Sequence, residues 1–142
     1  MSSEIKVGDI MSKNVISVTD EASIVEVATL MEKYNVGSIV VAENKKAEGI
    51  ITERDIVRKL VAKGKDTGKA KAGDAMSSPL KVITAEAGIE TAAKAMKEYS
   101  IKRLPVINES NELIGLISEG DIMRSFPAVV DLIEERAQVE RE

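Results

Sequence analysis

Two short stretches of the sequence carry the same pair of side chains that could bind a ligand. They are Thr52-Glu-Arg-Asp55 and Ser118-Glu-Gly-Asp121, each with a hydroxyl three residues before a carboxylate. A carboxylate can accept hydrogen bonds from both hydroxyls of a ribose, as the acidic residue of dinucleotide-binding folds does. The same spacing also fits a capping box, which only satisfies backbone amides at a helix start. Both interpretations stand together, because capping uses part of an aspartate's acceptor capacity.

A pair of cations, Lys102 and Arg103, precedes the apolar run Leu-Pro-Val-Ile. Arginine binds phosphate through a bidentate fork and lysine binds it as a point charge, so the pair suits a phosphate group. The simpler interpretation is a solvated basic pair. The corresponding residues of the first half are Gly37 and Ser38, and a glycine there would let a flat ring approach the backbone closely. The two halves therefore differ at this point.

Histidine and cysteine are both absent from the 142 residues. The commonest general base, the thiol nucleophile and the usual ligands of transition metals are therefore missing. No catalytic residue, no catalytic cofactor and no metal site is expected, and the protein is not expected to be an enzyme. Without cysteine there are no disulfides, which favours an intracellular protein.

The net charge of -4 gives no overall basic field of the kind that nucleic-acid binding uses. Five lysines lie between positions 59 and 71, and nucleic-acid binding through them is the weakest interpretation considered. We regard this run as solvated, because two tyrosines and one phenylalanine leave little on which bases could stack. The N-terminus has no apolar signal core, and no apolar run approaches the roughly 18 residues of a membrane span. We expect a cytoplasmic protein that binds neither nucleic acid nor membrane.

An internal repeat organises the chain. Residues 8–47 align with a second copy 65 positions later, and residues 49–58 align with a copy 66 positions later. Of these 50 aligned positions, 18 are identical, where chance would give about 3. The sequence is therefore a duplication, and the two hydroxyl-carboxylate motifs are equivalent positions of its copies.

Each copy shows the same order of hydrophobic patterns. Apolar residues at helical spacing predict helices over about 22–34 and 87–99, with Thr19 and Thr84 as their N-terminal capping signals. Short β-branched runs separated by polar turns predict a hairpin in each copy. These strands are expected at 38–42, 49–51, 104–107 and 113–117. A second helix is expected to start at Glu53 and at Glu119.

Each copy is thus a β-α-β-β-α unit of about 55 residues, which is too small to bury a good core alone. We expect an α/β (α+β) fold in which two such units pack sheet to sheet. The predicted division is a first repeat at 7–60, a linker at 61–72, a second repeat at 73–126, and an amphipathic C-terminal helix at 127–142.

The duplication, the phrase GIITERDIVRK and the strand KRLPVI together resemble a tandem pair of cystathionine β-synthase (CBS) domains. The resemblance covers Val7 to Phe126 and both copies in order. It implies a pseudo-twofold module with two clefts that often bind AMP, ADP, ATP or S-adenosylmethionine. It also implies a homodimer, and regulation of an attached or separate effector protein.

The resemblance assigns residues to the clefts by position. The family often has His-Arg at the positions of Lys102 and Arg103, so cleft one keeps the positive charge that the family has there. In cleft two Gly37 and Ser38 stand instead, and Gly120 replaces Arg54. The resemblance gives cleft one as Thr52, Arg54, Asp55, Leu80, Lys81, Lys102 and Arg103, and cleft two as Val15, Ile16, Val36, Gly37, Ser38, Ser118 and Asp121.

The function expected from the sequence is that of a regulatory module that binds adenine nucleotides and acts on a separate partner or on its own assembly. The alternative is a ligand-free scaffold for interaction or dimerisation, in which the two motifs only cap helices. Because the repeats fill nearly the whole chain, the regulated target is expected to be a separate protein or the module's own assembly.

Overall fold

The computed structural model describes residues 5–77 and 81–125, which form two compact units. Each repeat has the predicted order β-α-β-β-α and carries a three-stranded sheet, so the α+β fold class is confirmed. Leu80 and the helix expected at 127–142 lie outside the described residues. Within the described part of the chain, no helix has the length and apolar character needed to cross a membrane.

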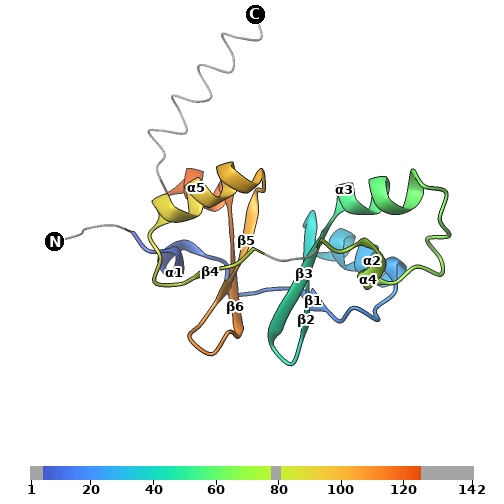
Figure 1. Ribbon diagram of the computed structural model, residues 1–142, viewed down its shortest axis with the longest axis horizontal. Coiled ribbons are helices and arrows are strands. Elements are labelled where there is room, and N and C mark those ends of the chain that lie inside the picture. The colour runs from blue at the N-terminus through green and yellow to red at the C-terminus, as the bar shows by residue number, and fades with distance from the viewer. Residues whose placement is uncertain (1–4, 78–80, 126–142) are drawn as a thin grey trace, which may run out of the picture. The chain divides into compact units, whose positions relative to one another are not determined.

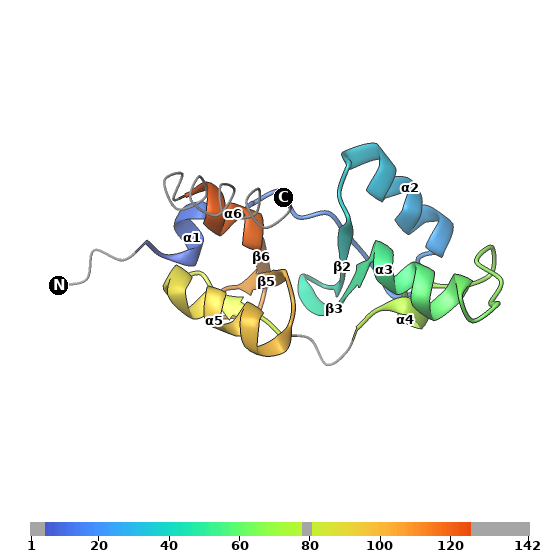
Figure 2. The same cartoon turned by 90° about the horizontal axis from the view of Figure 1, so that it is seen from above.

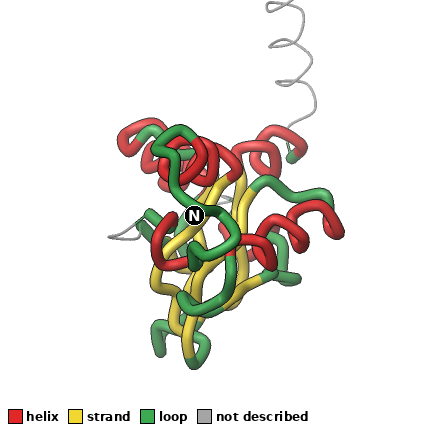
Figure 3. The backbone as a smooth tube through the Cα atoms, turned by 90° about the vertical axis from the view of Figure 1, so that its right-hand side faces the viewer, coloured by secondary structure: helices red, strands yellow, loops and turns green. Residues whose placement is uncertain are grey.

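The first-repeat unit contains the sheet of the first repeat, in the order β1-β2-β3. β1 runs parallel to β2, and β2 pairs antiparallel with β3 through the two-residue turn at Asn44 and Lys45. This turn lies at the end of the strands away from the helix that follows β3 (Figure 1), and Figure 3 shows the strands in yellow leading to turns in green. The elements are β1 (Ser17–Val18), α2 (Ile24–Tyr34), β2 (Ser38–Glu43), β3 (Lys46–Thr52), α3 (Glu53–Asp55), the π-helical segment η1 (Ile56–Val61) and α4 (Ala72–Ala75).

The second-repeat unit contains the sheet of the second repeat, in the order β4-β5-β6, with β4 parallel to β5 (Figure 1). Helices α3 and α6 start at Glu53 and Glu119, as the sequence predicts, and the other predicted boundaries agree within three residues. The elements of this unit are α1 (Val7–Ile10), β4 (Ile83–Thr84), α5 (Ile89–Tyr99), β5 (Arg103–Ile107), β6 (Leu113–Ser118) and α6 (Glu119–Arg124).

The helix starts at α2 and α5 correct one prediction. Thr19 and Thr84 are not the capping residues, because their carbonyls instead accept turn hydrogen bonds from the amides three residues later. The N-cap of α2 is Ser23, whose Oγ accepts a hydrogen bond from the Glu26 amide at 3.0 Å. The N-cap of α5 is Gly88, which has no side chain to offer. Thr84 ends β4 and Thr19 directly follows β1, and each helix begins five residues after its threonine.

Replacing Ser23 by alanine is expected to lower the free energy of unfolding by about 1 kcal/mol, because the Glu26 amide loses its acceptor. Thr19 is exposed and makes its turn contact through its backbone, so Thr19→Ala is the matched control and should change stability by less than about 0.5 kcal/mol. Urea unfolding of both variants measures the difference. If Thr19→Ala lost more stability than Ser23→Ala, Thr19 would be the capping residue after all.

The compact units do not follow the sequence repeats, because each unit includes a segment from the other repeat. Residues 6–12, the N-terminal docking segment, lie in the second-repeat unit. The amides of Val7 and Gly8 donate to the carbonyls of Ala87 and Ala85, at 2.8 and 2.9 Å. Farther along, the backbones of Ser12 and Leu116 exchange hydrogen bonds of 2.9 and 3.0 Å.

Residues 71–77, the middle docking segment, make the equivalent contacts in the first-repeat unit. The amides of Ala72 and Gly73 donate to the carbonyls of Ala22 and Asp20, at 2.7 and 2.9 Å. The Ser77 amide donates to the carbonyl of Ile50 at 2.9 Å. The two repeats therefore exchange their leading segments, and both docking schemes follow the 65- and 66-residue offsets of the duplication.

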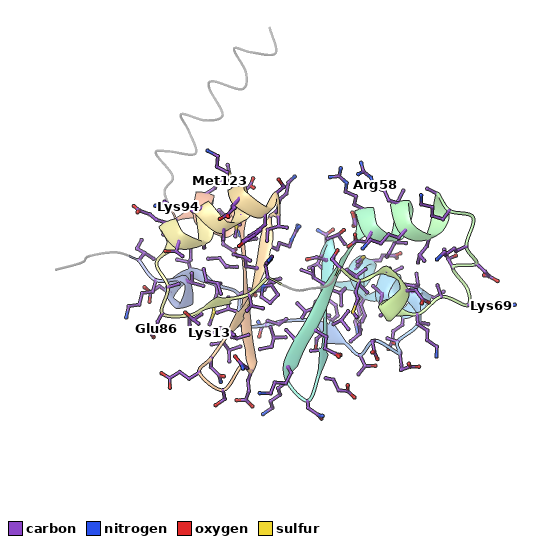
Figure 4. The ribbon with its side chains drawn as sticks, viewed as in Figure 1. Lys13, Arg58, Lys69, Glu86, Lys94 and Met123 are labelled. Atoms are coloured by element: carbon purple, nitrogen blue, oxygen red, sulfur yellow. The ribbon has the colours of Figure 1, made fainter. Side chains whose placement is uncertain are left out.

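Matching ion pairs accompany the two docking segments. Lys6 Nζ lies 2.8 Å from the carboxylate of Glu86, a residue labelled in Figure 4. Lys71 Nζ lies 2.6 Å from the carboxylate of Glu21. In each pair the pKa of the lysine ammonium is raised. The largest cause is the hydrogen bond to the glutamate, and the second is the negative charge of that glutamate. All four side chains are exposed to solvent, so these ion pairs contribute little to stability and mainly help to orient the docking segments.

Each unit has a hydrophobic core that the docking segment completes. Val7 is fully buried among residues of the second repeat such as Leu104, and Ala72 and Ala75 are fully buried with Leu60 of the first repeat. A unit of one repeat alone would lack this part of its core. The exchange of segments thus supplies the burial that a 55-residue unit cannot reach by itself.

Candidate functional site

The Thr52 motif is a complete capping box. Thr52 Oγ1 accepts a hydrogen bond from the Asp55 amide at 3.1 Å, and Asp55 Oδ2 accepts one from the Thr52 amide at 2.9 Å. The capping interpretation from the sequence is therefore confirmed for this motif. Its position is set by β3, which ends at Thr52, and by α3, which starts at the next residue.

The Ser118 motif has the same geometry in the second-repeat unit. Ser118 Oγ accepts from the Asp121 amide at 3.1 Å, and Asp121 Oδ2 accepts from the Ser118 amide at 2.9 Å. Because the backbone arrangement is the same at both motifs, they form a matched pair. Differences in their behaviour must come from the surrounding side chains.

The second carboxylate oxygen distinguishes the two motifs. Asp55 Oδ1 lies 3.4 Å from Lys59 Nζ, and Asp121 Oδ1 lies 2.5 Å from Arg124 Nη2. Both aspartates are mostly buried, with 16% and 17% of the side chain exposed. The partner cations differ, since Lys59 is 41% exposed and Arg124 is 73% exposed. The pair at Asp55 is therefore the more enclosed of the two.

Gly37 and Ser38 lie directly beside the Thr52 motif. Ser38 is the cross-strand partner of Thr52, and the Glu53 amide donates to the carbonyl of Gly37 at 3.1 Å. The nearest atom to a Cβ built on Gly37 would be 3.7 Å away, in the Glu53 carboxylate. A Cβ would therefore be in ordinary van der Waals contact with this carboxylate, so the Glu53 side chain lies next to the position predicted to receive a ring, and that role of Gly37 stays a prediction.

Lys102 and Arg103 occupy the equivalent place beside the Ser118 motif. Arg103 starts β5, and the Glu119 amide donates to the carbonyl of Lys102 at 2.8 Å. The structure thus brings each strand start next to the motif of its own repeat. The family resemblance instead pairs Asp55 with Arg103, and Asp121 with Gly37. Each of these pairs joins residues of different units, so the pairing stays a prediction.

The other predicted site residues differ in burial. Val15, Ile16 and Val36 are partly buried in the first-repeat unit, where Ile16 and Val36 pack against its core. Arg54 is exposed, Lys81 belongs to the same unit, and Leu80 lies outside the described residues.

Lys59 is the residue near this site that the sequence analysis missed. It belongs to the lysine run that we expected to be solvated, but its Nζ lies 3.0 Å from the carbonyl oxygen of Ala75 and is therefore engaged within the unit. Lys71, at the other end of the run, is paired with Glu21, whereas Lys69 extends away from its loop (Figure 4). The run is therefore not one continuous solvated surface. The four-residue spacing of Lys59 from Asp55 was the available signal for their contact.

Comparison with known protein families agrees with this architecture. The model of the CBS domain matches residues 7–62 and 72–128. The chain belongs to the CBS domain family. It is similar to the CBS domain-containing protein YhcV of Bacillus subtilis, with 34% identity over 116 residues that cover 82% of this chain and 81% of YhcV.

Solved structures of CBS proteins have the same fold. The CBS domain pair of protein MJ0100, in complex with 5-methylthioadenosine and S-adenosyl-L-methionine, matches with a TM-score of 0.79 and 26% identity over 88% of this chain and 98% of the other. A hexameric CBS-CP12 protein from bloom-forming cyanobacteria matches with a TM-score of 0.77 and 30% identity, covering 86% of this chain and 68% of that protein. The sequence-based identification of a CBS pair is therefore confirmed.

Proposed function

We propose that this CBS pair is a regulatory module that binds an adenine nucleotide and acts on a separate partner protein or on its own assembly. The observation that carries the proposal is the Asp55 carboxylate, which is held in place by the capping box and still has a second oxygen directed at a cation. The complex of the MJ0100 pair with two adenosyl compounds supports an adenosyl ligand for this chain.

The fixed carboxylate suits the ribose of such a ligand. Its Oδ2 is occupied by the Thr52 amide, while Oδ1 can accept from more than one donor and so can receive ribose hydroxyls. Because the capping box fixes the orientation of the side chain, little conformational entropy is lost when the ligand binds. Gly37, in the same unit, is the proposed position for an adenine ring, which requires the Glu53 carboxylate to turn aside.

The charge around Asp55 favours a nucleotide over S-adenosylmethionine. Arg54 and Arg58 are exposed on the helical segment that follows Thr52. These cations attract a phosphate, whereas they repel the sulfonium and ammonium groups of S-adenosylmethionine. We therefore expect AMP, ADP or ATP to bind more tightly than S-adenosylmethionine.

Thermal-shift measurements with AMP, ADP, ATP, S-adenosylmethionine and 5-methylthioadenosine test the proposal. A ligand at 100 times its dissociation constant should add about 2.7 kcal/mol to stability. The matched control is 2′,3′-dideoxy-AMP, which lacks both ribose hydroxyls and should give a much smaller shift than AMP. An equal shift from the dideoxy compound would contradict the role of Asp55.

The ligand-free scaffold is the competing function, and the capping boxes by themselves fit it equally well. It predicts no shift with any of these compounds at millimolar concentration. Sedimentation of the same samples then reports on assembly, because the mass of one chain is 15.3 kDa. A change of sedimenting mass on adding nucleotide would support regulation through self-assembly. Without such a change, we expect regulation of a separate partner.

A further inference from the structure

The ammonium group of Lys59 lies between the Asp55 carboxylate and the middle docking segment. Lys59 belongs to η1, which lies beside α4 of that segment (Figures 1 and 2). Four acceptor atoms surround its Nζ within 3.5 Å. They are the carbonyl oxygen of Ala75 at 3.0 Å, Ser77 Oγ at 3.3 Å, Asp55 Oδ1 at 3.4 Å and the carbonyl oxygen of Met76 at 3.5 Å.

The carbonyls of Ala75 and Met76 are at the C-terminal end of α4, where the last carbonyls of a helix have no partner within it. Lys59 supplies a donor and a positive charge at this end, which also suits the helix dipole. The docking segment comes from the second repeat, so a side chain of the first repeat stabilises a segment of the second. Lys59 is therefore a contact between the repeats inside one compact unit.

The ammonium group of Lys59 donates its hydrogen bonds to the three acceptors of the docking segment. Asp55 Oδ1 forms an ion pair with the same ammonium at 3.4 Å and so attracts it toward the Thr52 motif. A ribose whose hydroxyls donate to Asp55 Oδ1 would draw part of the carboxylate's negative charge away from Lys59. The ammonium would then be held more firmly by Ala75, Met76 and Ser77.

We propose that Lys59 couples the state of the Asp55 carboxylate to the docking of residues 71–77, so that ligand binding at Asp55 tightens the docking segment. The ligand part of this proposal rests on the proposed function, whereas the link between Lys59, Asp55 and the segment does not. By thermodynamic reciprocity, a firmly docked segment also favours the ligand.

The coupling belongs to the first-repeat unit alone. The position equivalent to Lys59 in the second repeat is Ser125, whose hydroxyl donates to the backbone carbonyl of Asp121 at 3.0 Å. Asp121 is paired instead with the exposed Arg124. The second repeat thus offers a matched motif without the lysine link, and Asp121→Asn serves as a control.

Hydrogen exchange of the Ser77 amide, measured by NMR, tests the link without any ligand. This amide donates to the Ile50 carbonyl, so its exchange reports on the opening of the docking segment. Lys59→Met should speed its exchange about three- to tenfold, since the segment loses a hydrogen-bonded cation. Lys63→Met, which removes an exposed lysine one turn later, and Asp121→Asn should leave the exchange unchanged. Lys59→Arg, which keeps charge and donors, should retain most of the protection.

Asp55→Asn tests whether Lys59 couples Asp55 to the docking segment or only holds that segment in place. The amide oxygen of the new side chain can still accept from the Thr52 amide, but the neutral side chain no longer attracts the ammonium of Lys59 as an ion-pair partner. In the wild-type background, we expect Asp55→Asn to slow the exchange of the Ser77 amide about two- to threefold. In the Lys59→Met background, we expect Asp55→Asn to leave that exchange unchanged, because the lysine that links the two sites is missing. Equal effects of Asp55→Asn in both backgrounds, or unchanged exchange in Lys59→Met, would overturn the proposal.

A ligand arm completes the experiment. AMP should slow Ser77 exchange in the wild type, and by less in Lys59→Met when both are saturated. If AMP binds but protects the Ser77 amide equally in both proteins, the ligand coupling is wrong. If no nucleotide binds the wild type, the proposed function fails, while the ligand-free variants still decide whether Lys59 links Asp55 to the docking segment.

Discussion

Replacing Gly115 by alanine is expected to lower the free energy of unfolding by about 1 to 3 kcal/mol, one of the two largest effects we expect of a single substitution. A Cβ at this position of β6 would lie 2.5 Å from Met11 Sδ and 3.0 Å from the carbonyl oxygen of Ser12. The methionine can move, but the carbonyl is held by the hydrogen bonds between Ser12 and Leu116. The N-terminal docking segment must therefore shift away from β6.

Gly49→Ala should have a similar effect in the other unit, where the new Cβ would lie 2.8 Å from Met76 Sδ and 2.9 Å from the Ser77 carbonyl oxygen. Gly37→Ala is the matched control, because its nearest atom would be at 3.7 Å, and it should change stability by less than about 0.5 kcal/mol. Urea unfolding midpoints measure all three variants. Wild-type stability in Gly115→Ala would show that the docking segment does not pack against β6 in solution.

A second variant tests the contact itself. In a Met11→Ala background part of the steric conflict at Gly115 is removed, so Gly115→Ala should cost less there than in the wild type. The carbonyl of Ser12 remains in place, so some cost should persist. Strictly additive effects of Met11→Ala and Gly115→Ala would mean that the two residues are not in contact.

The local structure of each repeat could be predicted because it depends on short-range patterns. Apolar residues at helical spacing define α2 and α5, and the hydroxyl-carboxylate spacing at Thr52 and Ser118 marks the starts of α3 and α6. The prediction of capping threonines is wrong for a local reason too. Thr19 and Ser23 are both suitable caps by residue type, and the turn after β1 decides between them.

The exchange of docking segments could not be predicted from periodicity, because it pairs residues about 80 to 100 positions apart for one segment and about 25 to 50 for the other. A signal was nevertheless present. Gly-Asp-x-Met-Ser recurs at residues 8–12 and 73–77, and each copy meets the glycine of the GII or GLI strand in the opposite repeat. Residues that are identical in both copies, but that do not belong to a helical or strand pattern of hydrophobicity, therefore indicated a tertiary contact.

The contacts of Lys59 escaped prediction for a related reason. Its pairing with Asp55 follows from helical spacing, but its contact with Ala75 depends on where the middle docking segment lies. Since that segment belongs to the other repeat, only the three-dimensional structure brings the three residues together. The candidate site is therefore partly local, in its capping boxes, and partly a product of the exchange between repeats.

Asp55→Ala and Arg103→Ala are each expected to weaken AMP binding about ten- to a hundredfold, because a hydrogen bond to a charged group contributes about 1.5 to 3 kcal/mol. For Asp55 this expectation follows from the proposed binding of the ribose, and for Arg103 it follows from the family resemblance, which predicts that Arg103 binds the phosphate. Titration calorimetry of AMP against the folded variants measures the dissociation constants. Unchanged affinity in Arg103→Ala would remove Arg103 from the phosphate site.

Asp121→Ala is the matched control for Asp55→Ala, because both aspartates make the same capping box with hydrogen bonds of 2.9 and 3.1 Å. Each substitution should therefore lower the free energy of unfolding by a similar amount, about 1 kcal/mol. If Asp55 also binds the ribose, only Asp55→Ala should lower AMP affinity strongly. If the motifs do nothing but cap helices, both variants should lose stability alike and AMP should bind to neither variant nor to the wild type. Because Arg103 adjoins the Ser118 motif through the Lys102 carbonyl, a joint loss of affinity in Asp121→Ala and Arg103→Ala, with Asp55→Ala unaffected, would instead assign the nucleotide to the second-repeat unit.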